Sequence, residues 1–191
     1  KKDEYELQVS DFSFYQIAEE YPISNKEHGI DFLLDNRHLW LRSKKQWAIM
    51  RVRDTLIRAT YDFMRDNAFT KIDSPIIAAN AGENTTDLFQ VKYFDETTYL
   101  SQTGQLYIEA AIFAHGRVFD FGPTFRAEKS KTRRHLTEFW MMDAEMAFVD
   151  LDGNLDTQER LIRSMVQAVL EKNRAELEIL ERDIAPLENI S

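Results

Sequence analysis

The feature that most constrains the fold is residues 121–143, in which a basic loop separates two apolar and aromatic runs. The first run, residues 118–125, ends at Arg126 and Glu128, and the second begins at Phe139. This pattern predicts two antiparallel strands joined by a charged turn. Because side chains at positions i and i+2 of a strand point to one face, Arg126 and Glu128 are expected to project together, with Phe139 near them on the returning strand.

A fixed cation, a carboxylate and an aromatic ring on one sheet surface have the chemistry to bind a nucleotide. The guanidinium of Arg126 would hold phosphate, the ring of Phe139 would stack on the base, and Glu128 would accept a hydrogen bond from an exocyclic amine. The alternative is that Arg126 and Glu128 form a simple surface ion pair, which would contribute well under ~1 kcal/mol. The residue types alone leave both interpretations open.

The order of the residues resembles motif 2 of the class II aminoacyl-tRNA synthetases. Residues 125–130 read FRAEKS and residues 133–140 read RRHLTEFW, which is similar to the subclass that contains the aspartyl and asparaginyl enzymes. The resemblance implies an ATP site, with Arg126 as the catalytic residue at the α-phosphate. The implied ATP-binding residues are Arg126, Glu128, His135 and Phe139. The implied tRNA-facing residues of the motif 2 loop are Lys129, Lys131, Arg133 and Arg134.

Composition narrows the class of protein further. The chain has 191 residues, of which 43% are hydrophobic and 12% aromatic, as expected for a globular domain with a sizeable core. It contains no cysteine, which excludes disulfides and thiolate metal sites, and it has no apolar run near the ~20 residues that cross a bilayer. A cytoplasmic location is therefore expected. The net charge of −9 argues against general nucleic-acid coating but leaves room for a local basic patch.

The N-terminal part predicts a boundary between two domains. Residues 6–14 alternate between apolar and polar side chains and predict a strand, for which the sequence shows no partner strand. The resemblance implies that residues 1–20 are the tail of an anticodon-binding barrel of the OB type. The alternative is a plain N-terminal edge strand. Residues 21–31 read as a linker, and residues 32–191 as the N-terminal part of a class II catalytic domain.

A long helix is predicted from a cap at Ser43 to about Asn67. Its apolar stripe consists of Trp47, Met50, Ile57, Tyr61 and Met64, with a neighbouring stripe of Ile49, Leu56 and Phe63. A strand over residues 69–72 follows, and Pro75 closes it. This order resembles motif 1, which implies a homodimer interface at Pro75. The alternative is an ordinary core helix and strand.

The middle of the chain predicts an amino-acid site. Residues 76–87 read as a polar covering loop, residues 88–93 as a strand and residues 94–98 as a turn, and a further strand ends at 101 before a helix that starts at Gln105. The resemblance implies that Glu83 binds the substrate ammonium, that Gln105 binds the amino acid, and that Asp143 accepts from an asparagine amide. Ile108 stands where aspartate-charging relatives carry a lysine, which favours asparagine. The alternative is that Ile108 is simply a buried helix residue.

The remaining chain predicts the second arm of the hairpin at residues 137–149, a turn at residues 151–154, and a final helix capped by Thr157. There is no glycine after Gly153, so motif 3 and the Mg²⁺ ligands of the family are expected outside this chain.

The predicted fold is α+β, with a mainly antiparallel sheet flanked by helices. The resemblance implies ATP and Mg²⁺ as cofactors, asparagine and tRNA(Asn) as partners, a homodimer, no membrane, and transfer of asparagine to its tRNA. The alternatives are aspartate charging, an enzyme that forms free asparagine, and a non-catalytic dimerising or binding fragment.

Overall fold

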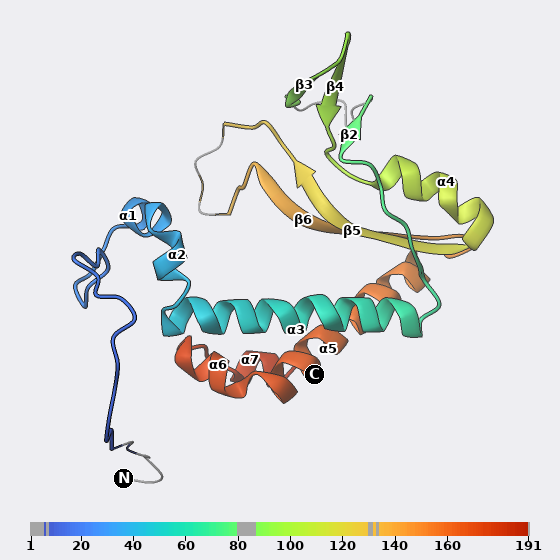
Figure 1. Ribbon diagram of the computed structural model, residues 1–191. Coiled ribbons are helices and arrows are strands. Elements are labelled where there is room, and N and C mark those ends of the chain that lie inside the picture. Colours follow the sequence, from blue (N-terminus) through green and yellow to red (C-terminus); the bar gives the residue numbers. More distant parts are fainter. Residues whose placement is uncertain (1–5, 7, 80–86, 130–131, 133, 191) are drawn as a thin grey trace.

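A long antiparallel hairpin forms the centre of the molecule, which is a computed structural model that describes residues 6, 8–79, 87–129, 132 and 134–190 (Figure 1). The hairpin consists of β5 (Arg117–Phe125) and β6 (Glu138–Met146). The short strand β1 (Thr70–Lys71) pairs with β5 in parallel, in the order β1-β5-β6. The helix α3 (Lys44–Asp66) runs along one side of the hairpin, and α4 (Gln105–His115) lies on the other. The predicted α+β class is confirmed.

The helix α3 begins and ends as its sequence predicts. The hydroxyl of Ser43 accepts a hydrogen bond from the backbone N–H of Gln46 at 3.4 Å, which satisfies one free donor of the first turn. At the other end, the Asn67 amide donates to the carbonyl of Phe63 at 2.8 Å. Two short helices, α1 (Ile30–Asp35) and α2 (Arg37–Trp40), precede it within the region predicted as linker and domain entry.

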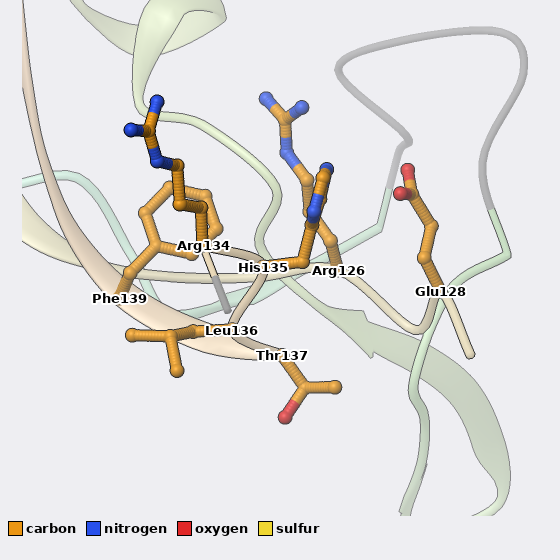
Figure 2. A pocket seen from close by; sticks show the side chains of 7 residues that line it. All are labelled: Arg126, Glu128, Arg134, His135, Leu136, Thr137 and Phe139. Atoms are coloured by element: carbon orange, nitrogen blue, oxygen red, sulfur yellow. The ribbon is translucent and has the colours of Figure 1, made fainter. Parts of the chain in front are cut away.

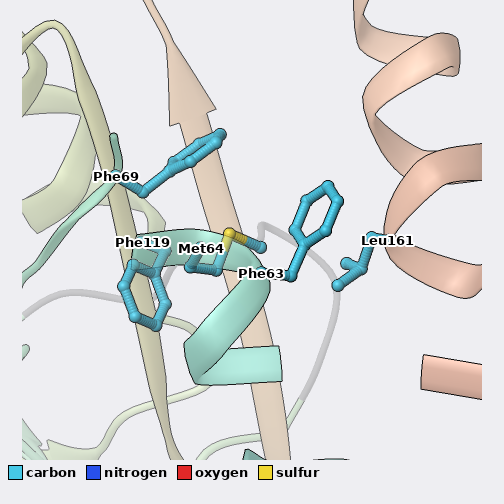
Figure 3. Close-up of a cluster of buried hydrophobic side chains, with 5 residues drawn as sticks. All are labelled: Phe63, Met64, Phe69, Phe119 and Leu161. Atoms are coloured by element: carbon cyan, nitrogen blue, oxygen red, sulfur yellow. The ribbon is translucent and has the colours of Figure 1, made fainter. Parts of the chain in front are cut away.

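The main hydrophobic core lies between α3, the hairpin and α5 (Leu151–Lys172), and Figure 3 shows five of its side chains. They are Phe63, Met64, Phe69, Phe119 and Leu161. A second cluster, Val169, Leu170 and Leu177, joins α5 to α6 (Arg174–Ile179). The helices α6 and α7 (Ala185–Glu188) lie on the far side of α3 from the hairpin.

The apolar stripe predicted for α3 is partly wrong. Trp47 is 49% exposed, Met50 40% and Tyr61 37%, whereas Phe63 and Met64 are buried as predicted. The full buried set is Ala48, Thr55, Ala59, Thr60, Phe63 and Met64. Its small side chains allow α5 and α6 to approach the backbone of α3 closely, so the helix packs through small residues as well as through large apolar ones.

A second sheet has the order β2-β4-β3 and is antiparallel throughout. Its strands are β2 (Ile77–Ala78), β3 (Gln90–Tyr93) and β4 (Glu96–Leu100). The turn predicted at residues 94–98 is limited to 94–95, and the predicted loop from residue 76 contains β2. The predicted helix from Gln105 is confirmed, and it ends at Gly116, whose φ of 73° is readily adopted by glycine.

The predicted turn at residues 151–154 is wrong, because these residues form the first turn of α5. The carboxylate of Asp150 accepts from the backbone N–H of Gly153 at 3.0 Å and caps the helix, seven positions before the predicted cap at Thr157. Gly153 fits because a Cβ at this position would lie 2.8 Å from Val149 Cγ1.

The strand predicted at residues 6–14 is also wrong for the part that the structure describes. Residues 6 and 8–20 have no strand assignment and are exposed, and Phe12 and Phe14 pack edge to face on each other at 5.1 Å. Alternating sequence does not form a strand without a neighbour to bond with, and no strand pairing involves these residues. Among the described residues, no helix is long and apolar enough to span a membrane.

Candidate functional site

The two faces of the β5–β6 hairpin differ in chemistry because side chains alternate along each strand. The face toward α3 and α5 carries Phe119, Phe121 and Met142, which pack in the main core. The opposite face carries Asp120 and, directly across from it, Asp143. Thr124 and Phe139 form a further cross-strand pair in the same alternation. This face, which we call the polar face, therefore carries polar side chains at several positions and continues toward the loop of the hairpin.

At the loop end of this face lies a pocket of about 340 Å³. It is lined by Arg126, Glu128, Arg134, His135, Leu136, Thr137 and Phe139. Figure 2 shows that the side chains of Arg126, Glu128 and His135 extend to the same side of the hairpin, whereas Leu136 and Thr137 point away from it. The pocket thus contains all four residues predicted to bind ATP.

Arg126 and Phe139 are neighbours as the predicted strand pairing requires. The guanidinium carbon of Arg126 lies 5.8 Å from the centroid of the Phe139 ring, within the range of a cation–π contact. The backbone N–H of Arg126 donates to the carbonyl of Thr137 at 3.0 Å, which extends the ladder past the end of β5. The N–H of Ala127 donates to the carbonyl of Asp87 at 3.2 Å, so the segment after β5 is also tied to the chain before β3.

The basic loop contributes to the pocket as well as to the surface. Arg134 lines the pocket, although the sequence resemblance places it with the tRNA-facing residues. His135 contacts the hydroxyl of Thr132 through Nδ1, and Lys129 is exposed. Lys131 and Arg133 lie outside the described residues. The loop therefore brings positive charge to the open side of the pocket.

A second polar cluster surrounds the turn at residues 101–104, which leads into α4. The hydroxyl of Thr103 donates to Asp143 Oδ2 at 2.7 Å and accepts from the backbone N–H of Gln105 at 3.1 Å. The exposed Gln105 side chain donates to Glu109 at 2.8 Å. Thr103 was not among the predicted residues, and no capping signal points to it, because the N-cap position of α4 is Gly104. Glu83 lies outside the described residues.

The acidic residues near α4 affect one another. Burial raises the pKa of the Glu145 carboxyl, and the charges of Glu109 and Asp143 raise it further. Ile108 has no exposed surface at all, which agrees with its interpretation as a buried helix residue. It offers no cation to this cluster, so a negatively charged substrate side chain would find no partner at position 108.

The pocket and the second cluster lie on one surface at a defined separation. Phe139 and Asp143 are four positions apart on β6 and point to the same face, which corresponds to about 13 Å along a strand. A ligand that spans both would have an aromatic base at Phe139, an anionic centre near Arg126 and a polar group near Asp143. A nucleotide joined to a small polar acid has this arrangement of groups.

The other predicted residues are placed as follows. Pro75 is exposed and lies between β1 and β2, next to Ser74, whose hydroxyl donates to the carbonyl of Gly104 at 3.3 Å. The strand predicted at residues 69–72 consists of Thr70 and Lys71, so it ends before Pro75. Among the described residues, no three His, Cys, Asp or Glu side chains are grouped to hold a metal ion.

The chain is similar to known proteins over most of its length. Residues 29–189 match the family model described as tRNA synthetases class II (D, K and N). An asparagine–tRNA ligase from Lactococcus lactis is 59% identical over 184 residues, which cover 96% of this chain and 41% of that protein.

Among solved structures, asparaginyl-tRNA synthetase from Pyrococcus horikoshii complexed with asparaginyl-adenylate matches with a TM-score of 0.89 and 42% identity, over 93% of this chain and 41% of that one. Aspartyl-tRNA synthetase from Entamoeba histolytica matches with a TM-score of 0.67 and 30% identity, over 87% of this chain and 30% of that one. The chain thus spans about two fifths of the length of the asparagine relatives. It belongs to the class II tRNA synthetases of the D, K and N group.

Proposed function

We propose that the whole protein containing this chain is an asparagine–tRNA ligase, which activates asparagine with ATP and transfers it to tRNA(Asn). The observation that carries this proposal is the pocket where Arg126, Glu128, His135 and Phe139 meet, on the sheet face that also carries Asp143. The named function of the relative from L. lactis and the asparaginyl-adenylate bound to the relative from P. horikoshii support it.

In the first step, a carboxylate oxygen of asparagine attacks the α-phosphorus of ATP. The bond from this phosphorus to the oxygen that bridges to the β-phosphate breaks, and pyrophosphate leaves. The α-phosphate carries extra negative charge in the transition state, and the guanidinium of Arg126 is placed to stabilise this charge. No side-chain nucleophile is needed, because the substrate carboxylate supplies the attacking oxygen.

The remaining pocket residues orient the nucleotide. The Phe139 ring stacks on adenine, and Glu128 accepts a hydrogen bond from the adenine amine. His135 and Arg134 lie on the open side of the pocket, where the outer phosphates would extend. In the second step, a ribose hydroxyl of the tRNA attacks the asparaginyl carbonyl and AMP leaves. We assign Lys129, Lys131, Arg133 and Arg134 to the approach of this tRNA.

The amino-acid end of the site follows from the second cluster. Gln105 and Asp143 flank Thr103, and Asp143 accepts from the side-chain amide of asparagine in this proposal. Glu83 would bind the ammonium group. A buried isoleucine at position 108 favours a neutral substrate side chain over the carboxylate of aspartate.

The proposal includes a homodimer whose interface contains Pro75, Mg²⁺ as the partner of ATP, and a cytoplasmic location. It assigns residues 1–20 to an anticodon-binding domain, residues 21–31 to a linker and residues 32–191 to the catalytic domain. The exposed apolar side chains near Pro75 in the structure, Ile76 and Ile77, support the placement of a subunit interface there.

Pyrophosphate exchange by the whole protein tests the proposal. Exchange of labelled pyrophosphate into ATP should depend on asparagine and should be at least about a hundredfold slower with aspartate, since a missing buried charge partner costs about 3–5 kcal/mol. Exchange that aspartate supports equally well would indicate an enzyme that charges aspartate. A protein that binds no ATP would be a binding module without this activity.

A further inference from the structure

Two carboxylates lie directly opposite each other on the polar face of the hairpin. Asp120 on β5 pairs in register with Asp143 on β6, and cross-strand partners have Cβ atoms about 4.5–5.5 Å apart. Like charges in this position repel each other, and Asp120 is 9% exposed, so water screens its charge poorly. An arrangement that keeps Asp143 available for a substrate therefore has to compensate the charge of Asp120.

Lys71 on β1 supplies this compensation. Its ammonium lies 3.0 Å from Asp120 Oδ1 and 2.8 Å from Asp73 Oδ1, and it donates to the carbonyl of Ile72 at 2.7 Å. Burial lowers the pKa of Lys71, but the hydrogen bonds and charges of the two carboxylates outweigh this and raise it, so the ammonium stays charged.

Asp120 also bounds the turn that enters α4. A Cβ on Gly104 would lie 2.3 Å from Asp120 Oδ2 and 2.7 Å from Ser74 Oγ, so the backbone of Gly104 packs directly on the carboxylate. The φ and ψ of Gly104, −85° and −4°, are accessible to any residue, so the close approach is what excludes a larger side chain. The adjacent Thr103 holds Asp143, and the same turn delivers Gln105.

We infer that Lys71 and Asp120 form a positioning pair for the amino-acid end of the site, in which Lys71 compensates Asp120 so that Asp143 and the turn carrying Gln105 keep their places. This inference rests on the proposed function. Neither residue has to touch the substrate. The pair acts on asparagine binding and leaves the ATP pocket, at the other end of the hairpin face, unaffected.

The test is asparagine-dependent pyrophosphate exchange by the whole protein with Lys71→Met, Asp120→Asn and the double variant. Lys71→Met leaves the Asp120 charge facing Asp143, so the KM for asparagine should rise on the order of tenfold while the KM for ATP stays within about twofold. Asp120→Asn added to Lys71→Met removes that charge and should recover most of the loss. The split between the two KM values separates a positioning role from a merely structural one, because loss of folded protein would lower activity without raising the KM for asparagine selectively.

Arg163→Met is the matched control, since it removes a cation from an exposed ion pair with Glu159 at 2.9 Å on α5. It should leave both KM values unchanged, and thermal unfolding should establish that every variant is folded. The inference is overturned if Lys71→Met leaves the asparagine KM unchanged, raises both KM values equally, or is not corrected in the double variant. If the wild-type protein exchanges pyrophosphate with no dependence on asparagine, the proposed function fails first and the inference falls with it.

Discussion

The two faces of the β5–β6 hairpin differ in their surroundings: one packs in the hydrophobic core, and the other carries polar side chains. Phe119 points into the core against Phe63 and Leu161, whereas its neighbour Asp120 points to the polar face and binds Lys71. The ladder between β5 and β6 is unbroken from Arg117↔Met146 to Phe125↔Glu138, so neither face needs an irregular backbone. Residues that stabilise the core and residues of the polar face therefore alternate by single steps along one strand. Substitutions on the two faces should therefore have different measurable consequences.

The largest effect is expected on the core face. Phe63→Ala should lower the free energy of unfolding by about 3–5 kcal/mol, because Phe63 is 8% exposed in the main cluster and its removal leaves a cavity. The melting temperature of the whole protein measures this loss. Phe113→Ala, on α4, is the matched control, since that ring is 92% exposed and its loss should cost within about 0.5 kcal/mol. Equal losses in the two variants would contradict the assignment of the core.

The second largest effect is expected for a substitution on the polar face. Arg126→Ala should slow asparagine-dependent pyrophosphate exchange about 10²–10³-fold while the melting temperature changes little, because in the proposed function it removes a group that stabilises charge in the transition state. Arg126→Lys should be intermediate, since it keeps the charge but loses the planar fork of donors. Arg58→Ala, on the exposed side of α3, is the control and should leave exchange unchanged. Near-normal exchange in Arg126→Ala would remove Arg126 from the mechanism.

A smaller effect should separate the two ends of the polar face. Phe139→Ala should raise the KM for ATP by roughly tenfold, because stacking of a base on an aromatic ring contributes about 1–3 kcal/mol. The KM for asparagine should be unchanged, since Asp143 lies a further four positions along β6. Phe139→Tyr keeps the ring and should retain most of the ATP affinity. A variant that weakened asparagine and left ATP unaffected would reverse the assignment of the two ends.

Local signals in the sequence predicted the elements that carry the site. The apolar run at residues 118–125 predicted the first hairpin arm, and Ser43 predicted the start of α3, because apolar runs and helix caps are signals carried by neighbouring residues of the chain. The resemblance to motif 2 predicted Arg126, Glu128, His135 and Phe139 as ATP-binding residues, and all four line one pocket in the structure. Their roles in the reaction stay predictions.

The remaining features depend on contacts between distant parts of the chain. Lys71 and Asp120 are 49 positions apart, so no spacing rule could pair them. The burial of Thr55 and Ala59 follows from how closely α5 and α6 approach α3, which the sequence of α3 does not specify. Residues 6–14 alternate between apolar and polar side chains, but the described residues among them form no strand, because a strand needs a neighbouring strand with which to form hydrogen bonds.

The smallest effect tests the acidic cluster beside α4. Glu145 has a raised pKa through burial and the charges of Glu109 and Asp143, so between its unfolded and folded pKa values the native state binds more protons than the unfolded state. Stability must then fall as pH rises through that window. Glu145→Gln removes this penalty and should raise the melting temperature at pH 7–8, with an effect on the order of 0.5 kcal/mol.

The advantage of Glu145→Gln should shrink as the pH falls below the raised folded pKa of Glu145 toward the unfolded carboxyl pKa, about 4.3, since native wild-type Glu145 then becomes protonated. Glu178→Gln, an exposed position on α6, should show no comparable trend with pH. Thermal unfolding from pH 8 to pH 5 measures both variants. A Glu145→Gln protein that was less stable than wild type at neutral pH would show that this carboxylate stabilises the polar face, and that the repulsion inferred there does not exist.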